Sequence, residues 1–275
     1  LSGRTQTGGL VGFVNGGVMH RVSADVTVQG TQYAAGLVGY ITGHSEMRHA
    51  YATGSVEGTD RVGGLVGNLY WGTATISDSY SRASVSGANN VGGLIGALGT
   101  ASLYRSYSTG VVSGTGDNVG GLLGGSGQTV ADCYWDTQTS GQDSSAGGEG
   151  RTTAQMKHRA TYQHYNFHAL WAIDEGSDYP VFQDLSQYAL PQPVDVAELE
   201  GSGTADDPYI VTTIDELNGA RQVLTATYRL ANDLDLAATV IWDYGRGWEP
   251  IGDATTPFAG TFDGGGYTIR NLHIN

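Results

Sequence analysis

The sequence predicts an all-β protein whose main part is a right-handed parallel β-solenoid with short capping helices. Three observations predict this fold. A glycine-rich pentapeptide recurs about every 28 residues, a valine motif accompanies it at a nearly fixed distance, and glycine supplies 44 of the 275 residues while proline supplies only 6. Glycine reaches the backbone conformations that tight turns need, so this composition favours many short strands bounded by turns.

The pentapeptide reads GGLVG, AGLVG, GGLVG, GGLIG and GGLLG at 8–12, 35–39, 63–67, 92–96 and 120–124. Successive copies are 27, 28, 29 and 28 residues apart. A repeat of this length suits one coil of a solenoid, and stacked coils lie about 4.8 Å apart, the ordinary strand spacing. Like positions then stack on like, which predicts one buried leucine column: Leu10, Leu37, Leu65, Leu94 and Leu122.

The second motif is a Val-x-Gly that begins at Val28, Val56, Val85 and Val112. The count from this valine to the next central leucine is 9, 9, 9 and 10, whereas the count from leucine to the following valine is 18, 19, 20 and 18. The nearly constant stretch from valine to leucine indicates tight packing. The variable stretch from leucine to valine indicates surface loops, which are expected at 13–22, 40–49, 68–78 and 97–105. A tyrosine column accompanies the valines: Tyr51, Tyr80, Tyr107 and Tyr134.

Charge and composition exclude several classes of protein. The formal net charge is −14, with Lys157 as the single lysine. This charge repels phosphate backbones, so we expect no nucleic-acid partner, and for the same reason no anionic membrane. Cys133 is the single cysteine and can make no internal disulfide. The low lysine content and the acidic, Gly/Ser/Thr-rich composition suit an exported protein. No apolar run reaches the length of a membrane span, so we expect no membrane insertion.

The repeats resemble the GLUG motif of large bacterial surface proteins, among them adhesins and some immunoglobulin A-cleaving metallopeptidases. The GGLVG units carry this resemblance, which covers most of 1–182. The stretch that starts CYWDTQTSGQDSS at Cys133 is similar to the segment that closes such arrays, and the last 75 residues are similar to the segment that opens them. The resemblance implies an exported β-solenoid scaffold and fixes no ligand.

Four segments follow from the patterns. Residues 1–135 are the predicted solenoid, and 136–185 a closing segment with a short helix at 152–159, capped by Thr152 or Thr153. Within it, Trp171, Tyr179 and Phe182 are expected to pack over the last coil and cover its open edge. Residues 186–203 are predicted to form a linker. Residues 204–275 are predicted to form an opening cap helix followed by the first coils of the next solenoid.

The last segment contains a capping box, in which Thr213 caps a helix and Glu216 stands three residues later. Leu217, Ala220 and Leu224 are expected along one face of that helix, and strands around 228–231, 258–262 and 267–274. The chain thus begins inside a solenoid and ends at the beginning of one. This order indicates a window of a tandem array, or a subunit that completes itself through a neighbouring copy.

The candidate chemistry lies in a polar ladder between Val-x-Gly and the next pentapeptide, with about one coil between its members: Asp60, Asn89 or Asn90, and Asp117 or Asn118. Such a ladder permits a carboxylate pair two coils apart, about 9–10 Å, or a calcium site of oxygen ligands. We favour the simpler interpretation, turn chemistry, because Asn and Asp adopt turn conformations readily.

Other candidate groups are weaker. His164 and His168 are four residues apart without the glutamate of the zinc-peptidase signature, which departs from the metallopeptidase relatives. His44 and His49 fall on a predicted loop and are expected to be solvated. The tyrosine column could stack against sugar rings, but stacked aromatic rings more often serve packing. Trp71 on the longest predicted loop is the better candidate for an exposed contact.

These observations favour a structural or adhesive repeat module of an extracellular bacterial surface protein or fibre, assembling head-to-tail. They predict no enzyme, and they assign no catalytic, cofactor-binding or metal-binding residue; calcium is the one ion kept as a candidate, and zinc at His164 and His168 is not favoured. The expected partners are copies of the chain or adjacent repeats, and host or matrix glycans. The alternative is a carbohydrate-binding or carbohydrate-active β-helix protein, which would need titratable groups converging in a groove.

Overall fold

The computed structural model describes residues 5–70, 72–183, 193–245 and 247–274. Its contacts divide the chain into two compact units. The first comprises Leu1–Tyr165 with Ile173–Pro180, and the second comprises Asn166–Ala172 with Val181–Asn275. We describe each unit by itself.

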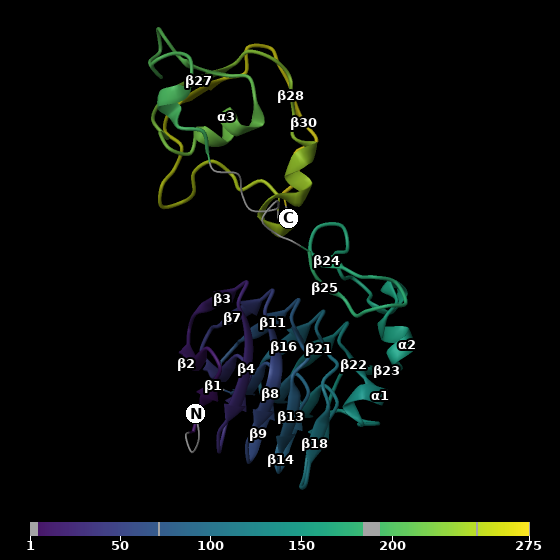
Figure 1. Cartoon of the computed structure of the whole chain (residues 1–275). Coiled ribbons are helices and arrows are strands. Elements are labelled where there is room, and N and C mark those ends of the chain that lie inside the picture. Colours follow the sequence, from purple (N-terminus) through teal and green to yellow (C-terminus); the bar gives the residue numbers. More distant parts are fainter. Residues whose placement is uncertain (1–4, 71, 184–192, 246, 275) are drawn as a thin grey trace. The chain divides into compact units, whose positions relative to one another are not determined.

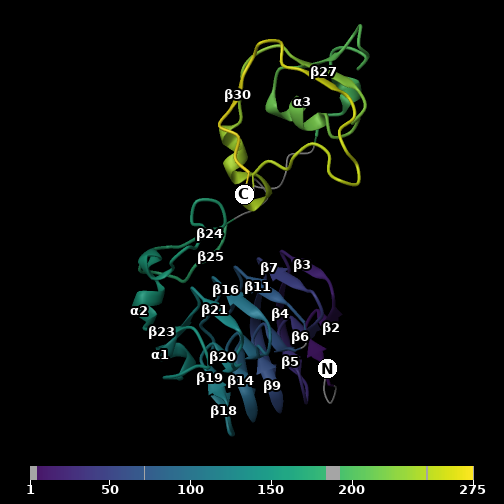
Figure 2. The same ribbon diagram turned by 180° about the vertical axis from the view of Figure 1, so that it is seen from behind.

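The first unit is a parallel β-solenoid, as the repeats predict. Three of its sheets contain five strands each, one strand per coil, and every coil-to-coil pair is parallel. The strands of successive coils lie side by side in Figure 1, from purple to teal, and Figure 2 shows the opposite side. The first sheet is β1(Thr7–Gly8), β5(Ala34–Ala35), β9(Asp60–Gly63), β14(Asn89–Gly92) and β19(Val119–Gly120); the second is β2(Val11–Asn15), β6(Val38–Thr42), β10(Val66–Leu69), β15(Ile95–Ala97) and β20(Leu123–Gly125).

The third sheet corrects one expectation. It consists of β3(Val18–His20), β7(Glu46–Arg48), β11(Thr75–Ser77), β16(Ser102–Tyr104) and β21(Thr129–Ala131). Four of these strands lie within the segments predicted as surface loops. The differences in coil length are therefore accommodated at the turns before these strands, where Gly16, Gly43, Gly72 and Gly99 have positive φ.

The fourth sheet carries the tyrosines and the Val-x-Gly motif. Its eight strands are β4(Ser23–Gln29), β8(Tyr51–Glu57), β12(Tyr80–Ser81), β13(Ser84–Gly87), β17(Tyr107–Ser108), β18(Val112–Gly114), β22(Tyr134–Asp136) and β23(Glu149–Arg151). Strand β8 is long enough to pair with both β12 and β13. The last coil continues into β23, which adds to β22 in parallel.

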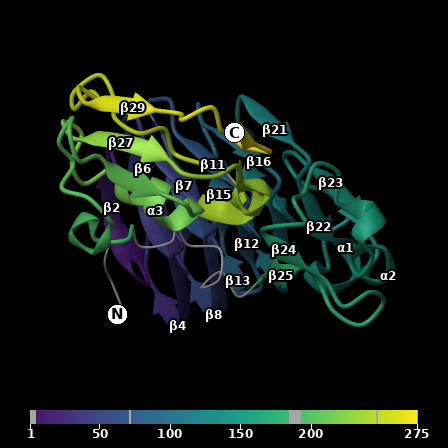
Figure 3. The ribbon, with the colours of Figure 1, turned by 90° about the horizontal axis from the view of Figure 1, so that it is seen from above.

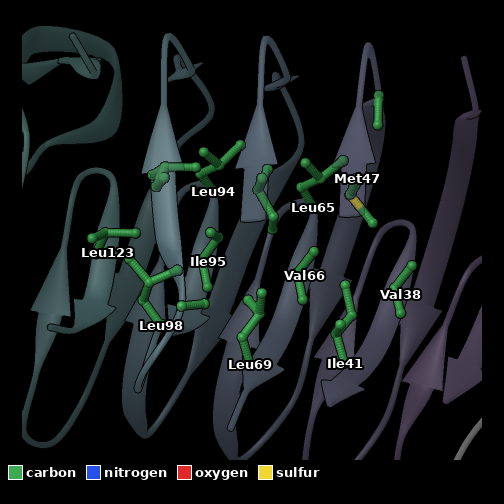
Figure 4. Close-up of a cluster of buried hydrophobic side chains, with 14 of the residues drawn as sticks. Val38, Ile41, Met47, Leu65, Val66, Leu69, Leu94, Ile95, Leu98 and Leu123 are labelled. Atoms are coloured by element: carbon green, nitrogen blue, oxygen red, sulfur yellow. The ribbon is translucent and has the colours of Figure 1, made fainter. Parts of the chain in front are cut away.

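The buried core follows the predicted columns with one exception. Leu37, Leu65, Leu94 and Leu122 are all 0% exposed and belong to one buried cluster. Figure 4 labels Leu65 and Leu94 together with side chains of the neighbouring columns. Leu10, however, is 55% exposed, so the prediction of a five-membered buried column is wrong at its first member. The physical reason is that the stacking order of the described strands places the first coil at an end of every five-stranded sheet.

The glycines of the pentapeptide are required by close backbone approach. A Cβ atom on Gly67 would lie 2.6 Å from the carbonyl oxygen of Gly39 and 2.7 Å from the carbonyl carbon of Tyr33. A Cβ on Gly64 would collide with the carbonyl of Gly93 in the next coil. These are distances that real side chains do not adopt, which explains why the motif returns as glycine in each coil.

Each coil also turns at two left-handed corners, where a residue other than glycine has φ between 42° and 60°. The first corner column is Gln6, Tyr33, Arg61, Asn90 and Asn118; the second is Arg21, His49, Asp78, Arg105 and Asp132. Left-handed backbone costs most L-residues roughly 1–2 kcal/mol. The stack therefore holds left-handed residues in ten positions. Of these, the sequence indicated turn conformations only at Asn90 and Asn118.

The closing segment of the first unit contains two short helices. α1(Thr137–Ser140) starts at Asp136, and α2(Thr153–Met156) starts at Thr152, whose side chain forms a full capping box with Gln155. The predicted helix at 152–159 is therefore correctly capped but ends earlier. It is followed by a 3₁₀ turn, η1(Arg159–Thr161), after an extended residue at His158.

The second unit begins with an antiparallel pair, β24(Trp171–Ala172) and β25(Val181–Phe182), in which Trp171 packs on Phe182. The predicted linker at 186–203 falls outside the described residues up to 192, and η3(Val196–Glu198) lies in its remainder. Helix α3(Ile214–Gly219) begins with the predicted capping box at Thr213. It buries Leu217 and is followed by buried Ala220, whereas Leu224 lies beyond its end and is half-buried.

Two small parallel sheets build the rest of this unit. One is β26(Tyr209–Val211), β27(Thr227–Leu230) and β29(Thr261–Asp263); the other is β28(Leu234–Asp235) and β30(Ile269–Arg270). Figure 3 shows β27 and β29 side by side. A 3₁₀ helix, η4(Ala237–Gly245), follows β28. Strands were expected at 228–231, 258–262 and 267–274, so their existence was foreseen while β26 and β28 were missed.

Candidate functional site

The predicted polar ladder is present along the first corner column. The side-chain amide of Asn90 donates to Oδ1 of Asp60 at 2.7 Å, and the amide of Asn118 donates to Oδ1 of Asn90 at 3.0 Å. The Arg61 guanidinium forms an ion pair with Oδ2 of Asp60. Asn90 and Asn118 both have left-handed backbone. The ladder therefore displays the turn geometry that Asn tolerates well, and hydrogen bonds between coils engage its oxygens.

The two carboxylates of the ladder are separated by a coil. Asp60 pairs in register with Asn89, and Oδ1 of Asn89 accepts a hydrogen bond from the backbone N–H of Asp117 at 3.0 Å. Among the residues that the structure describes, no group of three or more His, Cys, Asp or Glu side chains gathers as a metal site would require.

The tyrosine column is a stack of parallel rings. The rings of Tyr51 and Tyr80 lie 4.9 Å apart at 2°, and those of Tyr80 and Tyr107 lie 5.1 Å apart at 4°. Tyr134 continues the register, and Tyr162 of the closing segment meets it edge-on at 5.5 Å. Tyr80, Tyr107 and Tyr134 are buried. Their faces are therefore committed to packing, and burial raises the pKa of their hydroxyl groups.

Arg82 fastens the closing segment to this column. Its guanidinium lies over the rings of Tyr80 and Tyr179, at 5.7 and 5.4 Å from their centroids. It also donates to the carbonyl oxygen of Tyr179 at 3.1 Å and pairs with Asp178 at 3.4 Å. Tyr107 donates its hydroxyl hydrogen to the carbonyl of Pro180. Together these contacts cover the aromatic stack.

Asp136 is the second anchor of the closing segment. Its carboxylate is fully buried and accepts four hydrogen bonds. Oδ1 accepts from the backbone N–H groups of Gln138 and Thr139 and from the hydroxyl of Thr153, and Oδ2 accepts from the hydroxyl of Tyr179 at 2.6 Å. Burial and this bond raise the pKa of Tyr179 to about 12. Tyr179 thus packs on the last coil as expected, whereas Trp171 and Phe182 belong to the second unit.

A histidine pair is the main feature that the sequence did not indicate. Nε2 of His20 lies 2.8 Å from Nδ1 of His49, and their rings are 4.8 Å apart. Burial is the largest cause that lowers the pKa of each to about 4, and the charge of Arg48 adds to it. The expectation that His49 is solvated on a loop is wrong, because it occupies a left-handed corner after β7 and packs between coils.

The remaining candidates have ordinary surroundings. Nδ1 of His164 pairs with the carboxylate of Asp132 at 2.9 Å, and the backbone N–H of His168 donates to Oδ1 of Asn166. His44 lies 2.6 Å from the hydroxyl of Thr73. Trp71 lies outside the described residues. Cys133 is buried, and burial raises the pKa of its thiol to about 12. No helix in the described ranges is long and apolar enough to span a membrane.

Two known proteins match this chain over short stretches. The chain is 37% identical over 90 residues to a halomucin of Haloquadratum walsbyi, which covers 30% of this chain and 1% of that protein. It is 40% identical over 77 residues to a protein of Evansella cellulosilytica provisionally described as a Gly-rich membrane protein, covering 27% and 9%. The chain therefore spans a small part of either relative. No protein-family model matches it, and no solved structure does.

Proposed function

We propose that this chain is a structural repeat module of a large extracellular surface protein, with reach and rigidity rather than turnover as its function. The observation that carries the proposal is the continuous coil-to-coil register of the first unit. Valine and tyrosine pair with the same residue type of the next coil, and the leucines of the pentapeptides are joined from coil to coil by backbone hydrogen bonds. A repeat of this kind cannot bury its apolar face alone and gains stability from its neighbours.

The relatives support an exported, surface-located function. One is named a halomucin, the other is described as a Gly-rich membrane protein, and both are far longer than this chain. An acidic chain with one lysine remains soluble in such a setting, because net charge far from zero opposes association. The proposed partners are adjacent repeats or further copies of the chain, and the GLUG-type scaffold remains the proposed class.

A glycan-binding or carbohydrate-active function is the alternative. The fourth sheet has an outer hollow of about 300 Å³ lined by hydroxyl-bearing side chains such as Thr27, Ser55 and Ser84. An active site needs titratable groups that converge there, and Glu57 is the one acidic residue in its lining. Since the tyrosine faces are occupied by packing, the structural function is the better supported.

Single-molecule stretching between the chain ends tests the proposal. A mechanical spacer should unravel in discrete steps, each releasing one coil of about 28 residues, or roughly 100 Å of extended chain. The matched control is Leu65→Ala, which should lower the unfolding force of the coils around it. Featureless extension at low force, or saturable binding on a glycan array that Tyr51→Ala abolishes, would contradict a spacer function.

A further inference from the structure

Among the described residues, the first coil of the first unit and the last coil of the second unit both consist of edge strands. We infer that the edge strand β30 and the corner at Asn271 receive the first coil of a second copy of this repeat, so that β3 of that copy adds to β30 as the next parallel strand. The inference rests on the proposed structural function and deepens it, because it names the partner, the register and the residues in contact.

The open face of the second unit is apolar. Strands β29 and β30 are edge strands, each paired on one side only among the described residues. In the preceding coil Tyr228, Leu230 and Leu234 are buried, whereas the last coil exposes Phe262, Ile269, Leu272 and Ile274, the last of these by 56%. Several of these side chains line an apolar hollow of about 320 Å³ together with Leu217 and Leu236.

In the first unit the partly exposed coil is the first one, whereas in the second unit it is the last. Val38, Ile41 and Met47 of the second coil are buried, and their partners in register are Val11, Val14 and Met19 of the first coil. Those three remain half-exposed. The interior of the stack is thus sealed from the second coil onward. Among the described residues, β1, β2 and β3 of the first coil are the edge strands of their sheets, and apolar side chains accompany them.

The two ends share one local sequence of backbone conformations. In the first unit a left-handed glycine, Gly16, precedes the interior residue Met19 by three positions, and the left-handed corner Arg21 follows it by two. In the second unit Gly266, Ile269 and Asn271 repeat this spacing, with φ of 84° at the glycine and 57° at the corner. The segment that ends in Asn271 therefore has the turn–strand–corner geometry on which the first unit builds each coil.

This correspondence fixes the register of the junction. Ile269 stacks on Met19 and Arg270 on His20, as Met19 and His20 stack on Met47 and Arg48 within the first unit. The backbone N–H of Arg21 donates to the carbonyl of Arg48, so that of Asn271 would donate to the carbonyl of His20 in the incoming coil. The junction ends at Leu272, because Ile274 already bridges Gly247 in its own unit.

A cysteine pair tests this register. Position 268 lies one residue before Ile269 and position 18 one residue before Met19, so Thr268→Cys and Val18→Cys should face each other on the outer surface. The native Cys133 is buried and its thiol is largely protonated at neutral pH, so the introduced pair is the reactive one. The matched control combines Thr268→Cys with Thr75→Cys, the same outward position two coils further along.

The experiment is run on a mixture of separate 275-residue chains and on a tandem chain of two copies. When two copies are joined end to end, Arg21 of the second copy lies 25 positions after Asn271 of the first. A three-residue Gly-Ser-Gly insert between the copies therefore restores the 28-residue distance between successive corners, as between Arg21 and His49. Under mild oxidation the introduced pair should form a disulfide on the order of a hundredfold faster than the control in the tandem chain, because the junction raises its effective concentration.

Faster cross-linking in the mixture as well would show that separate copies stack; cross-linking confined to the tandem chain would assign the junction to consecutive repeats of one polypeptide. Equal rates for pair and control in both arms would overturn the inference. That result would leave the stretching behaviour of a single copy unchanged, so failure of the junction is distinguishable from failure of the proposed spacer function.

Discussion

The hydroxyl group of Tyr179 donates a 2.6 Å hydrogen bond to Oδ2 of Asp136, which joins the end of the closing segment to a fully buried carboxylate of the last coil. The other oxygen of that carboxylate starts α1 and holds Thr153 at the start of α2. One side chain therefore orients three parts of the closing segment. A buried acceptor with four donors is costly to remove, because each donor loses its partner.

Asp136→Ala is expected to lower the free energy of unfolding by on the order of 3 kcal/mol, since several buried donors lose their acceptor. The milder Tyr179→Phe removes one donor and should cost about 1.5 kcal/mol. Urea unfolding followed by tyrosine fluorescence measures both. Equal stabilities of Asp136→Ala and the unmodified chain would show that the closing segment is held by other contacts.

The leucine column provides a matched pair of substitutions. Leu65→Ala should cost about 2–5 kcal/mol, as for other buried leucines. Leu10→Ala, the same substitution at the same pentapeptide position, should cost less than about 1 kcal/mol because Leu10 is largely exposed. Chemical denaturation of the two variants measures both losses of unfolding free energy. Similar losses for Leu10→Ala and Leu65→Ala would mean that the first coil is covered in solution.

The histidine pair predicts a loss of stability in mild acid. The pKa of both side chains is about 4 in the folded chain, below the ordinary value of 6.5. The unfolded chain therefore takes up protons first as the pH falls, so the stabilising contribution is complete above pH 6.5 and is lost between 6.5 and 4. The melting temperature should fall across this window, and His49→Gln should flatten the slope. An unchanged slope would exclude the pair as its source.

The corner column predicts different costs for two substitutions of one residue. Asn90→Ala and Asn90→Gly both remove the hydrogen bonds to Asp60 and Asn118. Only alanine has a Cβ that strains the left-handed backbone, at roughly 1 kcal/mol or more. Asn90→Gly is therefore expected to unfold at the higher denaturant concentration. The opposite order would mean that chain entropy outweighs corner strain at this position.

The repeat could be predicted from the sequence because each coil must present leucine, valine and tyrosine to the same neighbours. The polar ladder was also predictable, since Asn90 and Asn118 favour the left-handed corner they occupy. The second corner column was not, because its members include Arg21 and Arg105, whose intrinsic preferences oppose that conformation. Stacking overrides those preferences, and no local pattern records it.

The histidine pair and the buried Asp136 were missed for a related reason. His20 and His49 are 29 residues apart, in the part of the repeat whose length varies, so their alignment becomes visible only when the third sheet fixes the register. Asp136 stands in a polar stretch that resembles a surface turn. Its burial depends on Tyr179, 43 residues later, which sequence spacing does not connect to it.

The spacing of the two corner columns has a consequence for the gene that encodes such a chain. From the second corner of one coil to the first corner of the next, the chain has 12 or 13 residues, whereas the arm from first to second corner varies from 14 to 17. Recombination between two coils therefore keeps both corners in frame wherever the crossover falls within the short arm. Whole coils can be duplicated or deleted in this way, and the length of the protein can change between generations without a new fold.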